Sequence, residues 1–337
     1  MRIAFLGSGA FGLPTLEAIA GEHEVPLVVS QPDRPAGRGR RDTPTPISAR
    51  VLADREQGSG PFAGTTLLRT DDINGDDARA VLDELRPDAL VVIAFGQKIG
   101  PGVLDGRFAV NLHASVLPRW RGAAPINRAM MAGDAETGIS VISLAERMDA
   151  GDVHAIRTTP IDPAETAGEL HDRLAGLGPD AVLEVLDRFG RGEIRAEPQD
   201  ESRATRAAKL GRGDATVDFA ADAAAVRARI HGLVPWPGCE VRVETPGDAP
   251  PPIDRLRLHR VEVVDLPDDP ADGVATEAGR SPGEVNADGL VACGHGAVRL
   301  LEVQAPGGRV LDWDSFHRGR PLPPGTRLRP RDGERSR

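Results

Sequence analysis

The stretch FAVNLHASVLPRWRGAAPINRAM, residues 108–130, decides how this chain is organised. Its apolar start predicts a buried strand, and Pro118 predicts a turn before a helix that begins near Ala124. Asn111 and His113 stand two residues apart at the end of that strand, so both side chains point to one face. An amide can donate a hydrogen bond to an oxyanion and an imidazole can transfer a proton, a pairing that suits acyl transfer.

A carboxylate follows later in the chain, in the segment Met148-Asp149-Ala150-Gly151-Asp152. Asp149 is able to hold the tautomer of an imidazole. Taken singly, each of the three residues has an ordinary explanation. An Asn at a strand end often starts a turn, a lone His often lies in a core, and Asp-x-Gly is a common turn. The three residues predict an active site only together with the sequence around them.

Composition limits the class of protein. Hydrophobic residues make up 40% of the chain, and the mean hydropathy is −0.27. No apolar run approaches the roughly 20 residues of a membrane span, and no export signal precedes the first strand pattern, so we expect a cytosolic protein without membrane contact. The two cysteines, Cys239 and Cys293, lack the spacing of metal ligands. We expect free thiols and no metal.

The first half of the chain predicts an α/β fold. Residues 89–94 form a continuous apolar run, which is typical of a strand buried on both faces of a parallel sheet. Residues 76–85 and one long segment over 165–188 have helical spacing, and residues 137–144 alternate as a strand. From Cys239 onward, short β-like runs between Gly, Pro and Asp residues predict a small barrel.

Length and composition also predict the domain boundaries. A chain of 337 residues exceeds the roughly 250 to 300 residues at which single cores stop growing, so we expect two domains. Gly, Arg and Pro gather around residues 190–197, which indicates a linker. The prediction is a catalytic domain over residues 1–190, a linker over 191–207 and a C-terminal domain over 208–330.

The first turn matches a dinucleotide-binding fingerprint. Residues 7–12, Gly-Ser-Gly-Ala-Phe-Gly, follow an apolar strand and fit G-x-G-x-x-G, and Asp33 comes about 20 residues later. That aspartate, however, is embedded in residues 31–41, a loop of prolines, glycines and arginines, rather than free at a strand end to bind a ribose. A dehydrogenase is therefore the weaker interpretation.

The formal net charge of −10 argues against a nucleic-acid partner, because phosphate contacts need cations. The basic residues nevertheless cluster in two internal patches and a tail. These are Arg34, Arg38, Arg40, Arg41 and Arg50; Arg203, Arg206, Lys209 and Arg212; and the arginines of residues 318–337. An exposed loop rich in Arg and Gly can place guanidinium groups on phosphates, so RNA binding at these patches is predicted.

Four motifs together resemble a known family. The runs NLHASVLP (111–118) and WRGAAPI (120–126), the closing DAGD (149–152) and the loop QPDRPAGRG (31–39) are similar to those of formyltransferases that use 10-formyltetrahydrofolate. Within this family the resemblance is to the methionyl-tRNA formyltransferases, and it covers nearly the whole chain. It implies a Rossmann-like formyltransferase domain with a mostly parallel sheet, followed by a smaller OB-like barrel that binds tRNA.

The resemblance also implies which residues act. Asn111 would donate to the oxyanion, His113 would be a second donor or proton carrier, and Asp149 would orient His113 or accept a proton from the amine through water. The implied folate-binding residues are Ile93, Phe95, Gly96, Gln97, Ser115, Val116, Leu117 and Pro118. The implied tRNA-binding residues are Arg34, Arg38, Arg40, Arg41, Arg206 and Lys209. The expected partners are 10-formyltetrahydrofolate as co-substrate and initiator methionyl-tRNA, with no metal and a monomeric chain.

Some residues depart from the family, and other interpretations stay open. The family usually has Tyr at the position of Phe95, and Asp and Gly at those of Ala145 and Arg147. A glycinamide ribonucleotide formyltransferase shares the three catalytic residues but normally has one domain. A sugar-nucleotide formyltransferase shares them and lacks the RNA loop. An inactive RNA-binding module would make the three residues accidental.

Overall fold

The computed structural model describes residues 1–36, 41–247, 251–264 and 281–330. The chain divides into two compact units, each described below by itself. The first unit comprises Met1–Gly122, Gly138–Thr159 and His171–Arg206, and the second comprises Ala123–Thr137, Pro160–Leu170 and the chain from Ala207 onward. The predicted domain boundaries at residues 190 and 208 remain a prediction.

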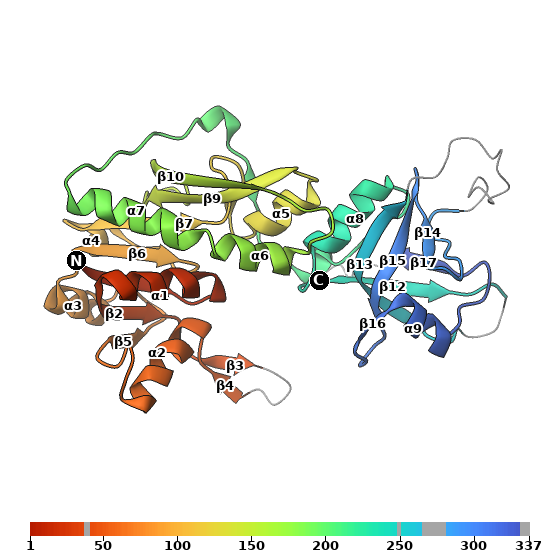
Figure 1. Cartoon of the computed structure of the whole chain (residues 1–337), viewed down its shortest axis with the longest axis horizontal. Coiled ribbons are helices and arrows are strands. Elements are labelled where there is room, and N and C mark those ends of the chain that lie inside the picture. The colour runs from red at the N-terminus through yellow and green to blue at the C-terminus, as the bar shows by residue number, and fades with distance from the viewer. Residues whose placement is uncertain (37–40, 248–250, 265–280, 331–337) are drawn as a thin grey trace. The chain divides into compact units, whose positions relative to one another are not determined.

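A seven-stranded sheet forms the centre of the first unit (Figure 1). In spatial order its strands are β10 (Val153–Pro160), β9 (Glu136–Ser143), β7 (Phe108–His113), β6 (Ala89–Ile93), β1 (Arg2–Gly7), β2 (Glu24–Ser30) and β5 (Thr66–Arg69). The strands from β7 to β5 pair in parallel, and β9 pairs antiparallel with β7. The predicted mostly parallel sheet is confirmed.

Helices cover both faces of this sheet. They are α1 (Leu13–Glu22), α2 (Pro46–Gln57), α3 (Asp76–Leu85), α4 (Pro101–Leu104) and α7 (Gly178–Gly190). A further helix, α6 (Ala167–Ala175), contains residues of both units. Ala4 and Leu6 of β1 share one core with Leu82 of α3, because side chains two apart on a strand face the same side. Figure 1 shows α1 and α7 next to each other against the sheet, where they pack together.

Two local predictions were wrong. The single helix expected over residues 165–188 is two helices, because α6 ends at Ala175 and α7 begins at Gly178. Pro179 lies in the first turn of α7, where its missing N–H costs nothing, whereas inside one continuous helix it would break the hydrogen-bond ladder. The loop over residues 31–41 contains a short hairpin, with β3 (Arg34–Ala36) paired antiparallel to β4 (Arg41–Thr43).

The second unit is built around an antiparallel sheet. Its elements include α5 (Pro125–Met131), α8 (Ala223–Gly232), β12 (Cys239–Glu244), β13 (Arg255–Val264), β14 (Leu290–Ala292), β15 (Ala297–Gln304), β16 (Val310–Asp312), α9 (Trp313–Gly319) and β17 (Arg327–Pro330). The strand order is β14-β15-β13-β12-β17, with β16 paired to β15. Bridges from Glu284 to Arg327 and from Val285 to Val291 join the two outer strands. The sheet therefore closes into the small barrel that was predicted.

A buried histidine joins α8 to the barrel. His231 is only 2% exposed, and its Nε2 accepts a hydrogen bond of 3.0 Å from the backbone N–H of Val261. Because Nε2 accepts this bond, the hydrogen of the neutral ring is on Nδ1. Burial, reinforced by the nearby charges of Arg260 and Arg227, lowers the pKa of His231 from 6.5 to about 4. His231 is therefore neutral in the folded protein at neutral pH.

His231 makes stability depend on pH. Below pH 6.5 the unfolded chain binds a proton at this residue and the folded chain does not until about pH 4, so folding stability decreases as the pH falls through this range. The contribution reaches up to about 3 kcal/mol. Urea unfolding at several pH values should show a steeper decline for the native chain than for His231→Gln. Parallel declines in the two proteins would contradict this account.

Candidate active site

The carboxyl ends of the parallel strands meet at one edge of the sheet. The chain runs outward from β1 to β5 on one side and then returns to β6 and β7 on the other, which creates a topological switch point beside β1. The Gln31 side chain donates to the Phe95 carbonyl at 3.2 Å, and the Ser8 hydroxyl also contacts that carbonyl, at 3.5 Å. The turns after β1, β2 and β6 are thereby tied together at the edge where ligands bind in such folds.

His113 lies at this edge, at the end of β7, and is buried. Its Nε2 lies 2.9 Å from the carbonyl oxygen of Trp120. A carbonyl only accepts hydrogen bonds, so Nε2 carries a hydrogen. Nδ1 faces Asp149 Oδ2 at 3.6 Å. Nδ1 is therefore the ring nitrogen placed to exchange a proton beside the carboxylate.

Asn111 precedes His113 by two residues on β7 and is half-buried. Its neighbours across the sheet are Val92 on β6 and Ile142 on β9. Among the residues that the structure describes, no hydrogen-bond partner holds its side-chain amide. An unengaged amide at the edge where the strands end is able to donate to a bound molecule.

Asp149 sits in a backbone conformation that L-residues rarely adopt, with φ of 55°. Such a left-handed residue costs about 1 kcal/mol or more unless its surroundings hold it. Its Oδ2 accepts a 2.9 Å hydrogen bond from the backbone N–H of Gly122. A Cβ added at Gly151 would lie 1.8 Å from the Ser143 carbonyl oxygen, so only glycine fits there. The turn is therefore tightly constrained on the β9 side.

Gln199 is a contact of this turn that the sequence interpretation missed. Its side-chain amide donates to the carbonyl oxygens of Asp149, at 2.9 Å, and of Gly151, at 2.7 Å. Gln199 lies about fifty positions further along the chain, in a polar stretch without helical or strand periodicity. No local sequence signal connects it to Asp149.

The first predicted folate segment follows β6. Ile93 and Phe95 are buried, and Gly96 has φ of 81°, a value that favours glycine. The Gln97 side chain accepts from the Ile73 N–H and donates to a carbonyl of the same loop, both at 2.8 Å. Gln97 therefore supports a neighbouring loop through its side chain.

The second predicted folate segment, residues 115–118, follows β7. The Ser115 hydroxyl donates to the carbonyl of Arg119 at 2.7 Å. The Ser140 hydroxyl accepts from the N–H of Leu117 at 3.1 Å and donates to the Ser115 carbonyl at 2.8 Å. These bonds fix the course of a segment that also contains Val116 and Pro118. Both predicted folate segments lie at the carboxyl edge of the sheet.

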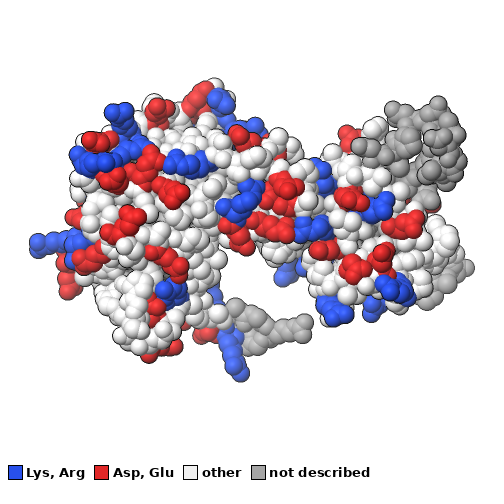
Figure 2. Space-filling model, viewed as in Figure 1, with Lys and Arg blue, Asp and Glu red and all other residues white. Residues whose placement is uncertain are grey.

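The predicted tRNA residues are divided between the two units. Arg34 and Arg41 are exposed on the β3–β4 hairpin, at the base of which Figure 2 shows basic side chains together. Arg206 and Lys209 are also exposed, at the end of the first unit and the start of the second. Arg38 and Arg40 lie outside the described residues.

One observation bears on the dehydrogenase interpretation. The Asp33 carboxylate, which a dinucleotide site would need for the ribose, pairs with Arg69 at 2.7 Å. Within the described ranges, no group of His, Cys, Asp or Glu residues has the arrangement of a metal site. In that same part of the chain, no helix is long and apolar enough to cross a membrane.

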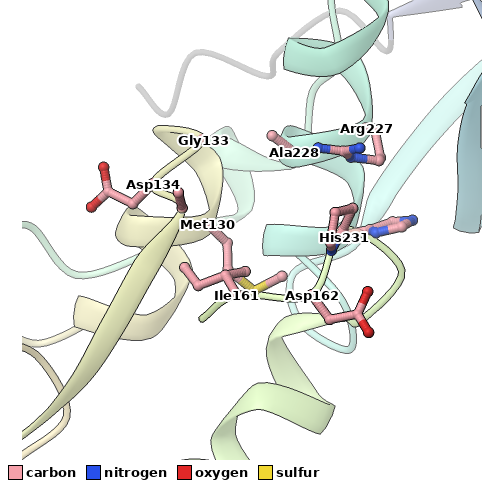
Figure 3. A pocket seen from close by; sticks show the side chains of 10 residues that line it. Met130, Gly133, Asp134, Ile161, Asp162, Arg227, Ala228 and His231 are labelled. Atoms are coloured by element: carbon pink, nitrogen blue, oxygen red, sulfur yellow. The ribbon is translucent and has the colours of Figure 1, made fainter. Parts of the chain in front are cut away.

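A separate pocket of about 230 Å³ lies in the second unit (Figure 3). Its lining residues are Met130, Gly133, Asp134, Ala135, Ile161, Asp162, Pro163, Arg227, Ala228 and His231. None of the predicted site residues belongs to it. Its histidine, His231, accepts a hydrogen bond from the barrel backbone, so its tautomer serves packing rather than proton transfer.

Comparisons with known proteins agree with this geometry. The Formyl transferase family model matches residues 1–186, and the model of the formyl transferase C-terminal domain matches residues 209–321. The solved structure of an N-formyltransferase from Helicobacter canadensis, in complex with folinic acid and dTDP-3-aminofucose, is similar with a TM-score of 0.61. It is 11% identical, and the match covers 90% of this chain and 98% of that one. At that identity the likeness shows the fold.

Two curated relatives are similar along their full lengths. A methionyl-tRNA formyltransferase from Ruegeria pomeroyi is 40% identical over 97% of this chain and 100% of its own. A methionyl-tRNA formyltransferase from Aromatoleum aromaticum is 40% identical over 97% of each chain. Both family models match, one after the other along the sequence. This chain therefore belongs to the formyl transferase family and, within it, to the methionyl-tRNA formyltransferases.

Proposed function

We propose that this chain transfers the formyl group of 10-formyltetrahydrofolate to the amino group of methionyl-tRNA, giving N-formylmethionyl-tRNA for translation initiation. The observation that carries the proposal is the contact between His113 Nδ1 and Asp149 Oδ2 at the carboxyl edge of the sheet. It occurs in a chain similar to methionyl-tRNA formyltransferases over 97% of its length. A monomer acting in the cytoplasm is part of the proposal.

The reaction requires one bond to form, one to break and one proton to move. The methionyl amine forms a bond to the formyl carbon, the bond from that carbon to the folate nitrogen breaks, and a proton passes from the amine to that nitrogen. A free α-amine has a pKa of about 7.7 to 8, and the neighbouring ester lowers it. Much of the nucleophile is therefore neutral at pH 7, and the main barrier is the charge that develops on the formyl oxygen.

The three residues divide this work. The Asn111 amide donates to the formyl oxygen as negative charge develops there. His113 carries the proton at Nδ1, because its Nε2–H is engaged by the Trp120 carbonyl. The Asp149 carboxylate orients the imidazole and stabilises it when Nδ1 is protonated. Burial of His113 and Asp149 strengthens their interaction relative to water.

Replacement of Asn111 or Asp149 should therefore reduce turnover without preventing folate binding. We expect Asn111→Ala to lower kcat by roughly 100- to 1000-fold, the usual effect of losing an oxyanion donor. Asp149→Asn keeps the shape of the side chain and removes its charge, so kcat should also collapse. Steady-state kinetics measure the loss of turnover, and equilibrium binding of a folate analogue shows whether the folate site is retained.

One substitution elsewhere in the first unit serves as a matched control. Asp77→Asn makes the same change of charge at an exposed side chain of α3, outside the proposed site, and should leave kcat close to that of the native chain. Turnover of the Asn111 or Asp149 variant within about threefold of the native value would refute the assignment.

The folate is proposed to lie along the backbone of residues 93–97 and 115–118, with residues 141–148 completing its site. The side chains of Gln97 and Ser115 are already engaged, so backbone N–H and C=O groups would recognise the pterin ring. The domains proposed for this work are a catalytic domain over residues 1–190 and a tRNA-binding barrel over residues 208–330.

The basic loop over residues 31–41 is proposed to bind the tRNA. Replacing Arg38, Arg40 and Arg41 with alanine removes three cations, so affinity for methionyl-tRNA should fall and its dependence on salt should flatten. If each arginine contacts one phosphate, the slope of log K against log salt decreases by about 2 to 3. The affinity for the formyl donor should not change. Filter binding over a range of salt concentrations measures the slope.

A triple variant elsewhere in the first unit controls for net charge. Arg79, Arg157 and Arg191 belong to or follow other elements, and their replacement by alanine removes the same total charge. This control should keep the native salt slope. An unchanged affinity in the hairpin variant, or an equal loss in both variants, would count against the hairpin as the tRNA site.

The acceptor is tested directly by supplying three candidates in parallel. The protein and 10-formyltetrahydrofolate are mixed with methionyl initiator tRNA, with glycinamide ribonucleotide or with an amino-sugar nucleotide, and formylated products are identified by mass spectrometry. We expect product with the charged tRNA. Product formed only with one of the other acceptors would replace the proposed substrate, while leaving formyl transfer in place.

A further inference from the structure

We propose that Gln199 is a positioning residue that holds the Asp149 carboxylate against His113. This inference rests on the proposed function of Asp149. Gln199 lies outside the three predicted catalytic residues and both predicted folate segments. It reaches the active-site turn through two hydrogen bonds to backbone carbonyls, at 2.9 Å and 2.7 Å.

The orientation of the Gln199 amide is determined by its four contacts. Its Oε1 accepts from the Nε and Nη2 of Arg121, at 3.0 Å and 2.8 Å. Its Nε2 donates to the carbonyls of Asp149 and Gly151. A guanidinium only donates and a carbonyl only accepts, so the flipped amide would lose all four bonds. The amide therefore fits this place in a single orientation.

These contacts form a closed ring around Asp149. The Gly122 N–H binds the Asp149 carboxylate at 2.9 Å. The Asp149 carbonyl binds Gln199, Gln199 binds the guanidinium of Arg121, and Arg121 is covalently joined to Gly122. Both the carboxylate and the backbone of Asp149 are thereby held by one two-residue segment, β8 (Arg121–Gly122). Loss of the Gln199 amide opens the ring.

The ring opposes the strain in the turn. Asp149 has a positive φ, and its surroundings must hold a conformation that an aspartate otherwise leaves. On one side the turn is fixed to β9, where the Ser143 N–H donates to the Asp152 carbonyl at 2.9 Å and Gly151 leaves no room for a Cβ. On the other side Gln199 binds the carbonyls before and after Ala150. Without Gln199, the backbone carbonyls of Asp149 and Gly151 lose the side-chain amide that binds them on this side.

Arg121 itself is well anchored. It is buried, at 8% exposure, and its guanidinium also binds Glu201 at 2.8 Å and 3.1 Å. Arg121 and then Arg147 lower the pKa of Glu201 to about 2, so Glu201 stays ionised. The Arg147 side chain is 70% exposed, and an ion pair so open to water stabilises little. The buried Arg121 contact, rather than Arg147, therefore supports Gln199.

A double-mutant cycle tests the proposal on the full-length chain. Gln199→Ala should lower kcat by roughly 10- to 100-fold, the cost of misplacing a catalytic group by about 1 Å, with little change in the KM for the formyl donor. Gln199→Glu keeps the size of the side chain, removes both N–H donors and should lose at least as much. Combined with Asp149→Asn, Gln199→Ala should cause no further loss, because its effect passes through that carboxylate.

The outcomes separate this inference from the proposed function. Additive losses in the cycle, or an unchanged kcat in Gln199→Ala, would overturn the positioning role. An Asp149→Asn variant with near-native kcat would instead overturn the catalytic role of Asp149. The matched control is Gln57→Glu, which changes an exposed glutamine at the end of α2, and it should retain native kcat. If Gln199→Ala does not fold, Gln199→Met, which keeps the volume without donors, replaces it in the cycle.

Discussion

The proposed active site depends on one hydrogen bond, between His113 Nε2 and the Trp120 carbonyl. Because that carbonyl accepts a hydrogen bond from the Nε2–H, Nδ1 is the ring nitrogen that is able to gain and lose a proton. It faces Asp149, so the chemistry of the imidazole is directed toward the carboxylate by the backbone itself. Trp120 also has a positive φ, at 62°, so the bond relies on a second backbone conformation that L-residues rarely adopt.

The sheet explains why residues so far apart in sequence meet here. Parallel pairing brings the ends of β1, β6 and β7 to one edge. β9 pairs antiparallel with β7, so its last residue, Ser143, lies beside Val110, and the segment that follows brings Asp149 back to His113. The glycine-rich turn after β1 contributes to that edge as well. Its resemblance to a dinucleotide fingerprint reflects the common geometry of strand–turn–helix units rather than a nicotinamide site.

Much of the sheet and of the candidate site could be predicted, because local sequence patterns determine them. The period of two placed Asn111 and His113 on one face, and the continuous apolar run at residues 89–94 predicted a central parallel strand. The predictions failed where local pattern and chain stereochemistry disagree, as at Pro179, where helical spacing continues across a residue that cannot continue a helix. The role of Gln199 could not be predicted, because its amide donates to backbone carbonyls. Every residue carries a carbonyl, so no residue type or spacing in the sequence indicates such a contact.

The ring through Gln199 has a consequence for where the catalytic portion of the chain ends. Compositional signals put a boundary near residue 190, and a fragment cut there would retain every strand of the seven-stranded sheet. It would nevertheless lack the Gln199 amide, which closes the ring around Asp149, and Glu201, which pairs with Arg121. If Gln199 positions Asp149 as proposed, an excised enzyme would therefore require the segment up to Arg206 as well as the seven-stranded sheet.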